Sequence, residues 1–216
     1  MQDQAPCSTW NFPTDTWPGD AQSVRLRPTK DGVLINIDEG RSLTSTALHG
    51  CCGGRLRAVF RTLSAEVWPG VDLRRFSGNG GSGGLRLDLD PGRGALRLAR
   101  WGRQGTTRAV QPIVPWTPTP LPPIATWTTL DVELQDNVVT AYIEGRLSLE
   151  VLLVHTWRGD FGVHISGPPL PVQDPAGQAA EVQRIDAWNI VEQPMSALDC
   201  FKVGRLTLPI PPRRAD

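Results

Sequence analysis

The eight tryptophans are the side chains of this 216-residue chain best suited to recognition chemistry. An aromatic face can stack on the apolar face of a sugar ring while Arg and Asp bond its hydroxyl groups, and aromatic rings also dominate protein interfaces. Several tryptophans lie in or beside segments with the composition of loops, which are free to carry contacts. The sequence therefore predicts a surface that binds a glycan or a protein, formed by Trp68, Trp101, Trp157, Asp72 and Arg100.

Each tryptophan also has a purely structural interpretation. A large aromatic side chain is highly buried on average, so it can fill space beneath a long loop without touching a ligand. Trp127 and Trp188 lie next to regular apolar patterns and are predicted to belong to the core. For any single tryptophan the structural interpretation is favoured over the binding one.

Paired carboxylates are the next candidates, because glycosidases act through two carboxyl groups that flank the scissile bond. Asp131 and Glu133 are spaced i, i+2, as are Asp88 and Asp90, so each pair shares one face of a strand. Both pairs alternate with a regular set of apolar residues. That alternation is typical of the solvated face of a half-buried strand, so no catalytic residue is predicted.

The histidines do not form a recognisable site. His49, His155 and His164 are scattered, and no Gly-x-Ser-x-Gly elbow is present. A metal site needs at least three convergent ligands, whereas Asp72 and Asp160 stand alone in their segments. No obligatory metal and no other cofactor is predicted, and calcium has no support from the sequence.

The elements that would hold these residues are strands. Residues 130–135 alternate between apolar and polar types, and Asp136-Asn137 then breaks the run with residues that tolerate a left-handed turn. Further strands are predicted over 138–143, 147–151 and 161–165. We expect residues 127–165 to form consecutive antiparallel strands, with these core positions: Leu130, Val132, Leu134, Tyr142, Leu147, Leu149, Phe161, Val163 and Ile185.

The remainder of the chain fits the same class. Residues 85–90 and 95–101 predict a hairpin across a Pro-Gly-Arg-Gly turn, and 56–63 predicts a further strand. Residues 64–84 are predicted to be a glycine-rich loop. The six prolines of 112–123 predict an extended polyproline-like connection across one end of the domain.

The run WTTLDVELQDNVVTAYIEGRL, which begins at Trp127, resembles the concanavalin A-like lectin/glucanase jelly rolls. In that superfamily a tryptophan opens a strand, and an aromatic-rich strand ends in an acidic-Gly turn, here Glu144-Gly145. A Gly-x-x-Gly-Val strand from Gly159 and a closing Ile-Asp-x-Trp-x-Ile strand from Ile185 complete the pattern. The resemblance implies an all-β, two-sheet antiparallel jelly-roll β-sandwich over roughly residues 20–192.

The resemblance does not choose an activity. The superfamily includes lectins, glucanases, laminin-G-like modules and 3-keto-disaccharide hydrolase-like domains, and a fold shared so widely does not define a function. The Glu-x-Asp-x-(x)-Glu motif of its laminarinase-like branch is absent. We therefore expect a non-catalytic binding module. The alternatives are a sugar-active enzyme of the 3-keto-disaccharide hydrolase-like kind and a structural decoration or appendage protein of a viral particle or cell envelope.

The four cysteines fit no zinc pattern. Their even number permits two disulfides in three connectivities, and free thiols are the alternative. Since terminal strands of jelly rolls are often neighbours, the resemblance makes a bridge between Cys7 and Cys200 plausible. Cys51 and Cys52 could bond each other or find other partners.

Composition and charge limit the remaining possibilities. The 22 basic and 22 acidic residues give a formal net charge of zero, which argues against nucleic acid as a partner. No apolar run is long enough for a membrane span, and the N-terminus has no signal-peptide pattern. We expect an arm over 1–20 packed on the sandwich, a jelly-roll domain over 21–192 and an extension over 193–216. An extracellular, cell-surface or particle-associated setting is expected, with an oligomer or a larger assembly open.

Overall fold

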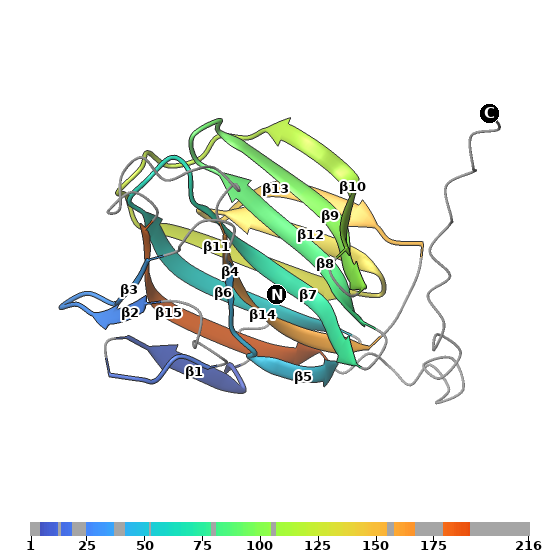
Figure 1. Ribbon diagram of the computed structural model, residues 1–216, viewed down its shortest axis with the longest axis horizontal. Coiled ribbons are helices and arrows are strands. Elements are labelled where there is room, and N and C mark those ends of the chain that lie inside the picture. The colour runs from blue at the N-terminus through green and yellow to red at the C-terminus, as the bar shows by residue number, and fades with distance from the viewer. Residues whose placement is uncertain are drawn as a thin grey trace.

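The computed structural model describes residues 5–12, 14–18, 25–36, 42–51, 53–78, 81–104, 107–154, 158–166 and 179–190. The described residues form strands and no helix (Figure 1). The strands, in chain order, are β1 Ser8–Asn11, β2 Arg25–Pro28, β3 Val33–Asn36, β4 Ser42–Thr44, β5 Leu48–Cys51, β6 Gly53–Thr62, β7 Trp68–Gly78, β8 Gly81–Asp90, β9 Ala95–Gln104, β10 Thr107–Pro118, β11 Thr128–Gln135, β12 Val138–Ile143, β13 Arg146–Leu152, β14 Gly159–Ser166 and β15 Ala179–Ile190.

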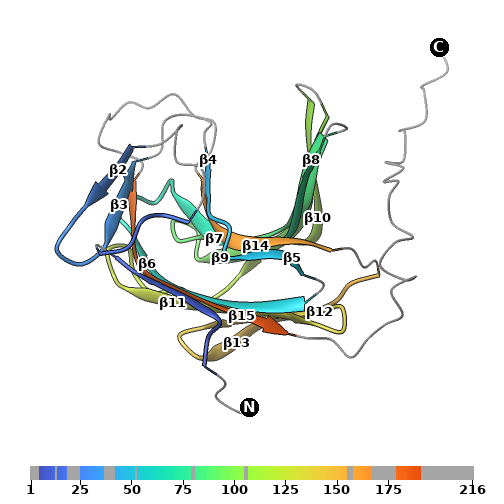
Figure 2. The same cartoon turned by 90° about the horizontal axis from the view of Figure 1, so that it is seen from below.

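The strands build two antiparallel sheets that pack face to face. The eight-stranded sheet has the order β13-β12-β11-β6-β15-β3-β2, with β1 paired to β15. The seven-stranded sheet has the order β10-β9-β8-β7-β14-β4, with β5 paired to β14. In Figure 2 the seven-stranded sheet curls away from its partner at both sides, toward β4 and toward β8 and β10, so its outer face is concave. The predicted all-β sandwich is confirmed.

The core lies between the sheets and follows side-chain alternation. Leu85, Leu87 and Leu89 of β8 point inward and are buried, as do the alternate residues of β11. Phe161 of β14 is fully buried at the centre. The predicted core is confirmed at Leu130, Val132, Leu134, Phe161, Val163 and Ile185, and Leu149 packs against it while partly buried.

Two of the predicted core residues are on the wrong face. Tyr142 pairs with Asp131 on the outer face of the eight-stranded sheet, between the buried Ala141 and Ile143. A register irregularity between β12 and β13 pairs Tyr142 with Leu147, and Leu147 is 59% exposed. Such an irregularity shifts the alternation of β13 by one residue at Leu147, whereas Tyr142 faces outward because Val139, Ala141 and Ile143 take the inward positions of β12.

The four strands expected over 127–165 do not form one continuous meander. β11, β12 and β13 are consecutive neighbours, as predicted. β14 instead crosses to the seven-stranded sheet, where it pairs with β7, β4 and β5. The crossing buries Phe161 against the opposite sheet: a Cβ added at Gly54 of β6 would lie 3.4 Å from its ring.

Two segments predicted as loops are strands. The predicted hairpin of β8 and β9 is present, and its sheet extends on one side into β7. Glycines in this region permit close approach: a Cβ at Gly70 would lie 1.9 Å from the carbonyl oxygen of Leu87. The prediction of a glycine-rich loop over 64–84 was therefore wrong for most of its length.

The proline-rich segment was also assigned incorrectly. Residues 107–118 form β10, which pairs with β9 through two register irregularities. Pro112, Pro115 and Pro118 are accommodated because β10 lies at the edge of its sheet, where a missing N–H removes no bond to a further strand. The predicted polyproline-like connection across one end of the domain is therefore wrong over these residues.

The N-terminal residues contact the sandwich. β1 pairs with β15, and Phe12 stacks on Trp17 with ring centroids 5.7 Å apart. Both rings are buried in the main core cluster. The expected irregular arm therefore contains a short strand, while residues 193–216 lie outside the described part of the chain.

Cys7 is a free thiol. Cys7 donates a hydrogen bond from its Sγ to the carbonyl oxygen of Ala187, at 3.1 Å. Cys51 is half-buried. Cys52 and Cys200 lie outside the described residues, and the free thiol of Cys7 does not support its predicted bridge to Cys200.

Candidate functional site

A layer of charged and aromatic side chains covers the concave outer face of the seven-stranded sheet. Because Leu85, Leu87 and Leu89 face the core, Arg86 and Asp88 between them face outward. The same alternation places side chains of β7, β9 and β14 on this face. We call this set the concave cluster: Trp68, Asp72, Arg86, Asp88, Arg97, Trp101, Trp116 and His164.

The first half of the concave cluster is a buried ion pair with an aromatic ring packed over its guanidinium group. Arg86 donates from Nε to Asp72 Oδ1 at 2.7 Å and from Nη2 to Oδ2 at 3.3 Å. The guanidinium carbon lies 4.8 Å from the centroid of the Trp101 ring. His164 Nδ1 lies 3.8 Å from Asp72 Oδ2 on the neighbouring strand. Asp72 and Arg86 are both buried, so pairing is needed to offset their lost hydration.

The second half carries a pair of tryptophans. Asp88 Oδ2 accepts a hydrogen bond from Arg97 Nε at 2.9 Å, and Arg97 Nη2 forms an ion pair with the same oxygen at 2.9 Å. The Arg97 guanidinium packs against two rings, 5.4 Å from Trp68 and 4.6 Å from Trp116. These two rings meet edge to face, with centroids 5.4 Å apart and planes at 62°. Both tryptophans are half-buried, so part of each ring stays open to solvent.

Two buried polar atoms of the concave cluster have no hydrogen-bond partner among the described residues. They are Asp88 Oδ1 and Trp101 Nε1, an acceptor and a donor on the same face. Buried polar atoms are almost always satisfied, so such exceptions call for a ligand or water. The cluster can therefore offer a hydroxyl-bearing ligand one acceptor and one donor beside two aromatic surfaces.

The carboxyl group of Asp88 gives a testable pH dependence. Burial raises the pKa of Asp88 above its ordinary 3.8, although Arg86 and Arg97 act to lower it. The folded protein then keeps a proton that the unfolded chain has lost, so this group's contribution to stability falls as pH rises from its ordinary pKa through the raised one. Relative to wild type, Asp88→Asn should gain stability across that window, measured by urea unfolding at stepped pH. A pH-independent difference between the two proteins would contradict the raised pKa.

The structure brings together three of the five predicted ligand-binding residues. Trp68, Trp101 and Asp72 belong to the concave cluster. Arg100 does not, because it lines a cavity at the sandwich edge with Leu85 and Leu152, on the other side of β9. Trp157 lies outside the described residues.

The reasoning behind the predicted site was wrong in two respects. Trp68 and Trp101 lie on strands, not in loops. Asp88, Asp90 and Asp131 are buried, whereas the sequence predicted a solvated face for them. The sequence reasoning missed Arg86, Asp88, Arg97 and Trp116 as members of the site. The pattern that could have revealed the charged members was the set of polar residues that alternate with apolar ones along each strand, and these were interpreted as a solvent-exposed face.

Other kinds of site find no support in the described residues. Among them, no group of three His, Cys, Asp or Glu side chains could hold a metal ion. No helix able to cross a membrane was found in the part of the chain that the structure describes.

Comparison with solved structures finds proteins that share the fold of this chain. The chain is similar to the carbohydrate-binding module CBM66 from Bacillus subtilis, with a TM-score of 0.56 and 12% identity over 76% of this chain and 91% of the module. It is similar to the exoplasmic/lumenal domain of VIP36 in its Ca²⁺/Man3GlcNAc-bound form, with a TM-score of 0.57 and 10% identity over 83% and 90%. An apo Crh5 transglycosylase matches with a TM-score of 0.51 and 12% identity over 84% and 83%.

These likenesses show that the chain shares the two-sheet β-sandwich fold of these proteins, which is the fold that its resemblance to the concanavalin A-like jelly rolls implied. The sequence itself gives no further assignment, because no protein-family model and no curated protein matches it. At 10–12% identity these structures show the fold alone, so the site must be argued from this chain's own residues.

Proposed function

We propose that the protein is a non-catalytic glycan-binding module and that the concave cluster is its binding face. The observation that carries the proposal is the edge-to-face pair of Trp68 and Trp116, held on Arg97 beside the buried Asp88 oxygen that has no partner among the described residues. Two half-exposed rings at an angle offer a surface for a sugar ring, and the adjacent polar atoms can bond its hydroxyls. The sugar-bound VIP36 domain and the carbohydrate-binding module support this kind of ligand for the fold.

The proposed absence of catalysis rests on how the carboxylates are engaged. Both oxygens of Asp72 accept hydrogen bonds from Arg86, and Asp72 is fully buried. A retaining glycosidase needs a second carboxylate free to attack the sugar, and an inverting one needs it free to activate water. Asp72 meets neither requirement. The proposed setting is a surface or extracellular assembly, and the exoplasmic/lumenal location of the VIP36 domain supports only a setting outside the cytosol.

One observation favours a sugar-cleaving enzyme as a second candidate. A carboxyl group with a raised pKa, such as Asp88, has the property of a general acid, and the fold is shared with a transglycosylase. Incubating the wild-type protein with any glycan it binds separates the two functions. Appearance of cleaved or transferred sugar, lost in Asp88→Asn, would replace the binding module with an enzyme.

Trp116→Ala should weaken glycan binding by about 1–3 kcal/mol, because it removes half of the paired aromatic surface. The ligand is first identified by screening the wild-type protein on a glycan array, and affinities are then measured by calorimetry. Trp68→Ala is expected to behave in the same way.

Trp127→Ala is the matched control. Trp127 is also half-buried, and the guanidinium carbon of Arg61 lies 4.6 Å from its ring centroid. It directly precedes β11, however, which belongs to the other sheet. Trp127→Ala should destabilise the protein about as much as Trp116→Ala does, but it should leave the affinity for the glycan unchanged. Equal loss of binding in Trp127→Ala and Trp116→Ala, or intact binding in both, would remove the concave cluster as the site.

A further inference from the structure

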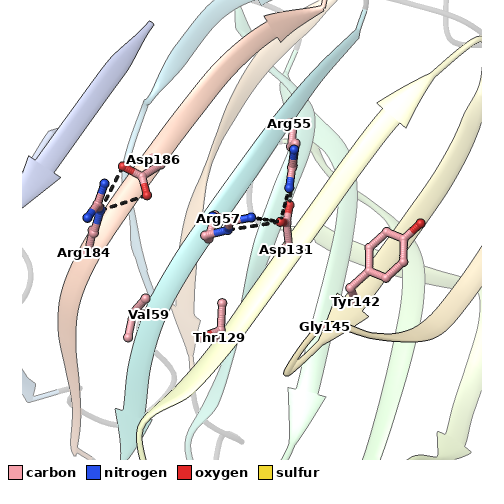
Figure 3. Close-up of a pocket in the computed structure, with 9 residues that line it drawn as sticks. All are labelled: Arg55, Arg57, Val59, Thr129, Asp131, Tyr142, Gly145, Arg184 and Asp186. Carbon is pink, nitrogen blue, oxygen red and sulfur yellow. Dashed lines mark hydrogen bonds and ion pairs between the residues drawn. The ribbon is translucent and has the colours of Figure 1, made fainter. Parts of the chain in front are cut away.

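A second cavity lies on the opposite side of the sandwich, on the outer face of the eight-stranded sheet. Its volume is about 460 Å³, within the usual range of small-molecule pockets. β15, β6, β11 and β12 each contribute to it, as Figure 3 shows. Tyr142 and Thr129 line it with hydroxyl groups and an aromatic ring, and the remaining lining is dominated by arginine and aspartate.

The lining of this cavity is rich in charged side chains. Asp131 accepts hydrogen bonds from both Arg55 and Arg57, each through Nε and Nη2. Arg184 pairs with Asp186 at 2.9 Å. Three of the residues that line the cavity are arginines and two are aspartates, so guanidinium groups outnumber carboxylates in its lining. A cavity with this balance attracts a ligand carrying a negative charge.

The donors that remain are fixed in place and accessible. Arg57 uses Nε and Nη2 for Asp131 and packs 5.6 Å from the Trp188 centroid, so its guanidinium is held on two sides. Its side chain is nevertheless 40% exposed, and that of Arg184 is 48% exposed. A guanidinium matches a carboxylate or sulfate with paired N–H groups, and one already held in place loses little freedom on binding.

We propose that this cavity is a second binding site, which takes a ligand that carries one carboxylate or sulfate group. Arg57 and Arg184 bind the anionic group together from the neighbouring strands β6 and β15, whose pairing holds them at a fixed separation. Tyr142 and Thr129 contact the rest of the ligand. An acidic saccharide and a small free anion present the same charged group. The site does not depend on the concave cluster, which lies on the other sheet.

The test uses the full chain and three probes: glucuronate, inorganic sulfate and glucose. Two-dimensional NMR of the arginine Nε–Hε groups follows each titration at low salt. Glucuronate should shift the signals of Arg57 and Arg184 and saturate, and its affinity should fall as salt rises. Arg57→Gln and Arg184→Gln should each weaken it about tenfold or more, which corresponds to the loss of one charge-assisted contact. Glucose should leave both signals in place.

Arg93→Gln is the matched control, because it removes the same charge from the turn between β8 and β9, where Arg93 is 69% exposed. The proposal is overturned if Arg93→Gln weakens glucuronate as much as Arg57→Gln does, or if neither cavity variant weakens it. It is also overturned if glucose shifts the two signals with equal affinity. Since Arg184 is half-exposed, Arg184→Gln remains informative if Arg57→Gln does not fold.

The probes also identify the source of the anion. Glucuronate binding at least tenfold tighter than sulfate indicates an acidic saccharide, whereas equal affinities indicate a free anion. Trp116→Ala should leave the glucuronate affinity unchanged. A failure of glycan binding at the concave cluster is therefore distinguishable from a failure of anion binding here.

Discussion

Asp72→Ala is expected to lower the free energy of unfolding by about 3–5 kcal/mol, because it leaves the buried guanidinium of Arg86 without its counter-ion. Asp72 is fully buried, the Arg86 side chain is 6% exposed, and two hydrogen bonds join them. Removing one partner retains the cost of burying the other charge and abolishes the attraction that offset it. Urea unfolding followed by tryptophan fluorescence measures the loss.

Two further variants isolate that effect. Asp72→Ala combined with Arg86→Met should recover much of the lost stability, because no unpaired charge is then buried. Asp160→Ala breaks a contact to His49, whose side chain is 81% exposed, and should cost about 1 kcal/mol or less. A loss below about 1 kcal/mol in Asp72→Ala would show that the Arg86 charge finds another partner or water.

Phe161→Ala should destabilise the protein by about 3–5 kcal/mol, through lost burial and the cavity that remains. Phe161 lies on β14 in the middle of the sandwich and has no solvent-accessible surface. Its ring reaches the opposite sheet beside Gly54, so its removal loosens the contact between the two sheets.

The same unfolding experiment checks this prediction. Leu152→Ala is the control, because Leu152 ends β13 with 71% of its surface exposed, and it should change stability by about 0.5 kcal/mol or less. A cost below about 1 kcal/mol for Phe161→Ala would indicate that the two sheets close over the cavity. Similar costs for the two variants would contradict the assignment of Phe161 to the core.

Sequence periodicity predicted the fold where strands are regular. The alternation of Leu130, Val132 and Leu134 placed β11 correctly, and the Pro-Gly-Arg-Gly turn located the hairpin of β8 and β9. The prediction failed where sheet position or register decides the outcome. The register irregularity beside Leu147 and the edge position that admits the prolines of β10 are properties of pairing partners, which local sequence does not contain.

The candidate site was predicted in part, for a related reason. Trp68 and Trp101 were selected as large aromatics near loop-like composition, although strands carry them. Arg86 and Asp88 were missed because alternating polar residues were taken to face water. Their burial results from aromatic rings contributed by β7, β9 and β10, and strands separated in sequence come together only in the folded sheet.

The prolines of β10 have a consequence for how the molecule behaves when it is crowded. An exposed edge strand is a template on which a second copy can add a strand, and repetition of that step leads to aggregation. Pro112, Pro115 and Pro118 each lack the N–H that such an added strand would need. This edge of the seven-stranded sheet is thus a poor template for fibril growth. The concave face beside it can therefore stay accessible at high local concentration, because copies of the protein do not add to one another along this edge.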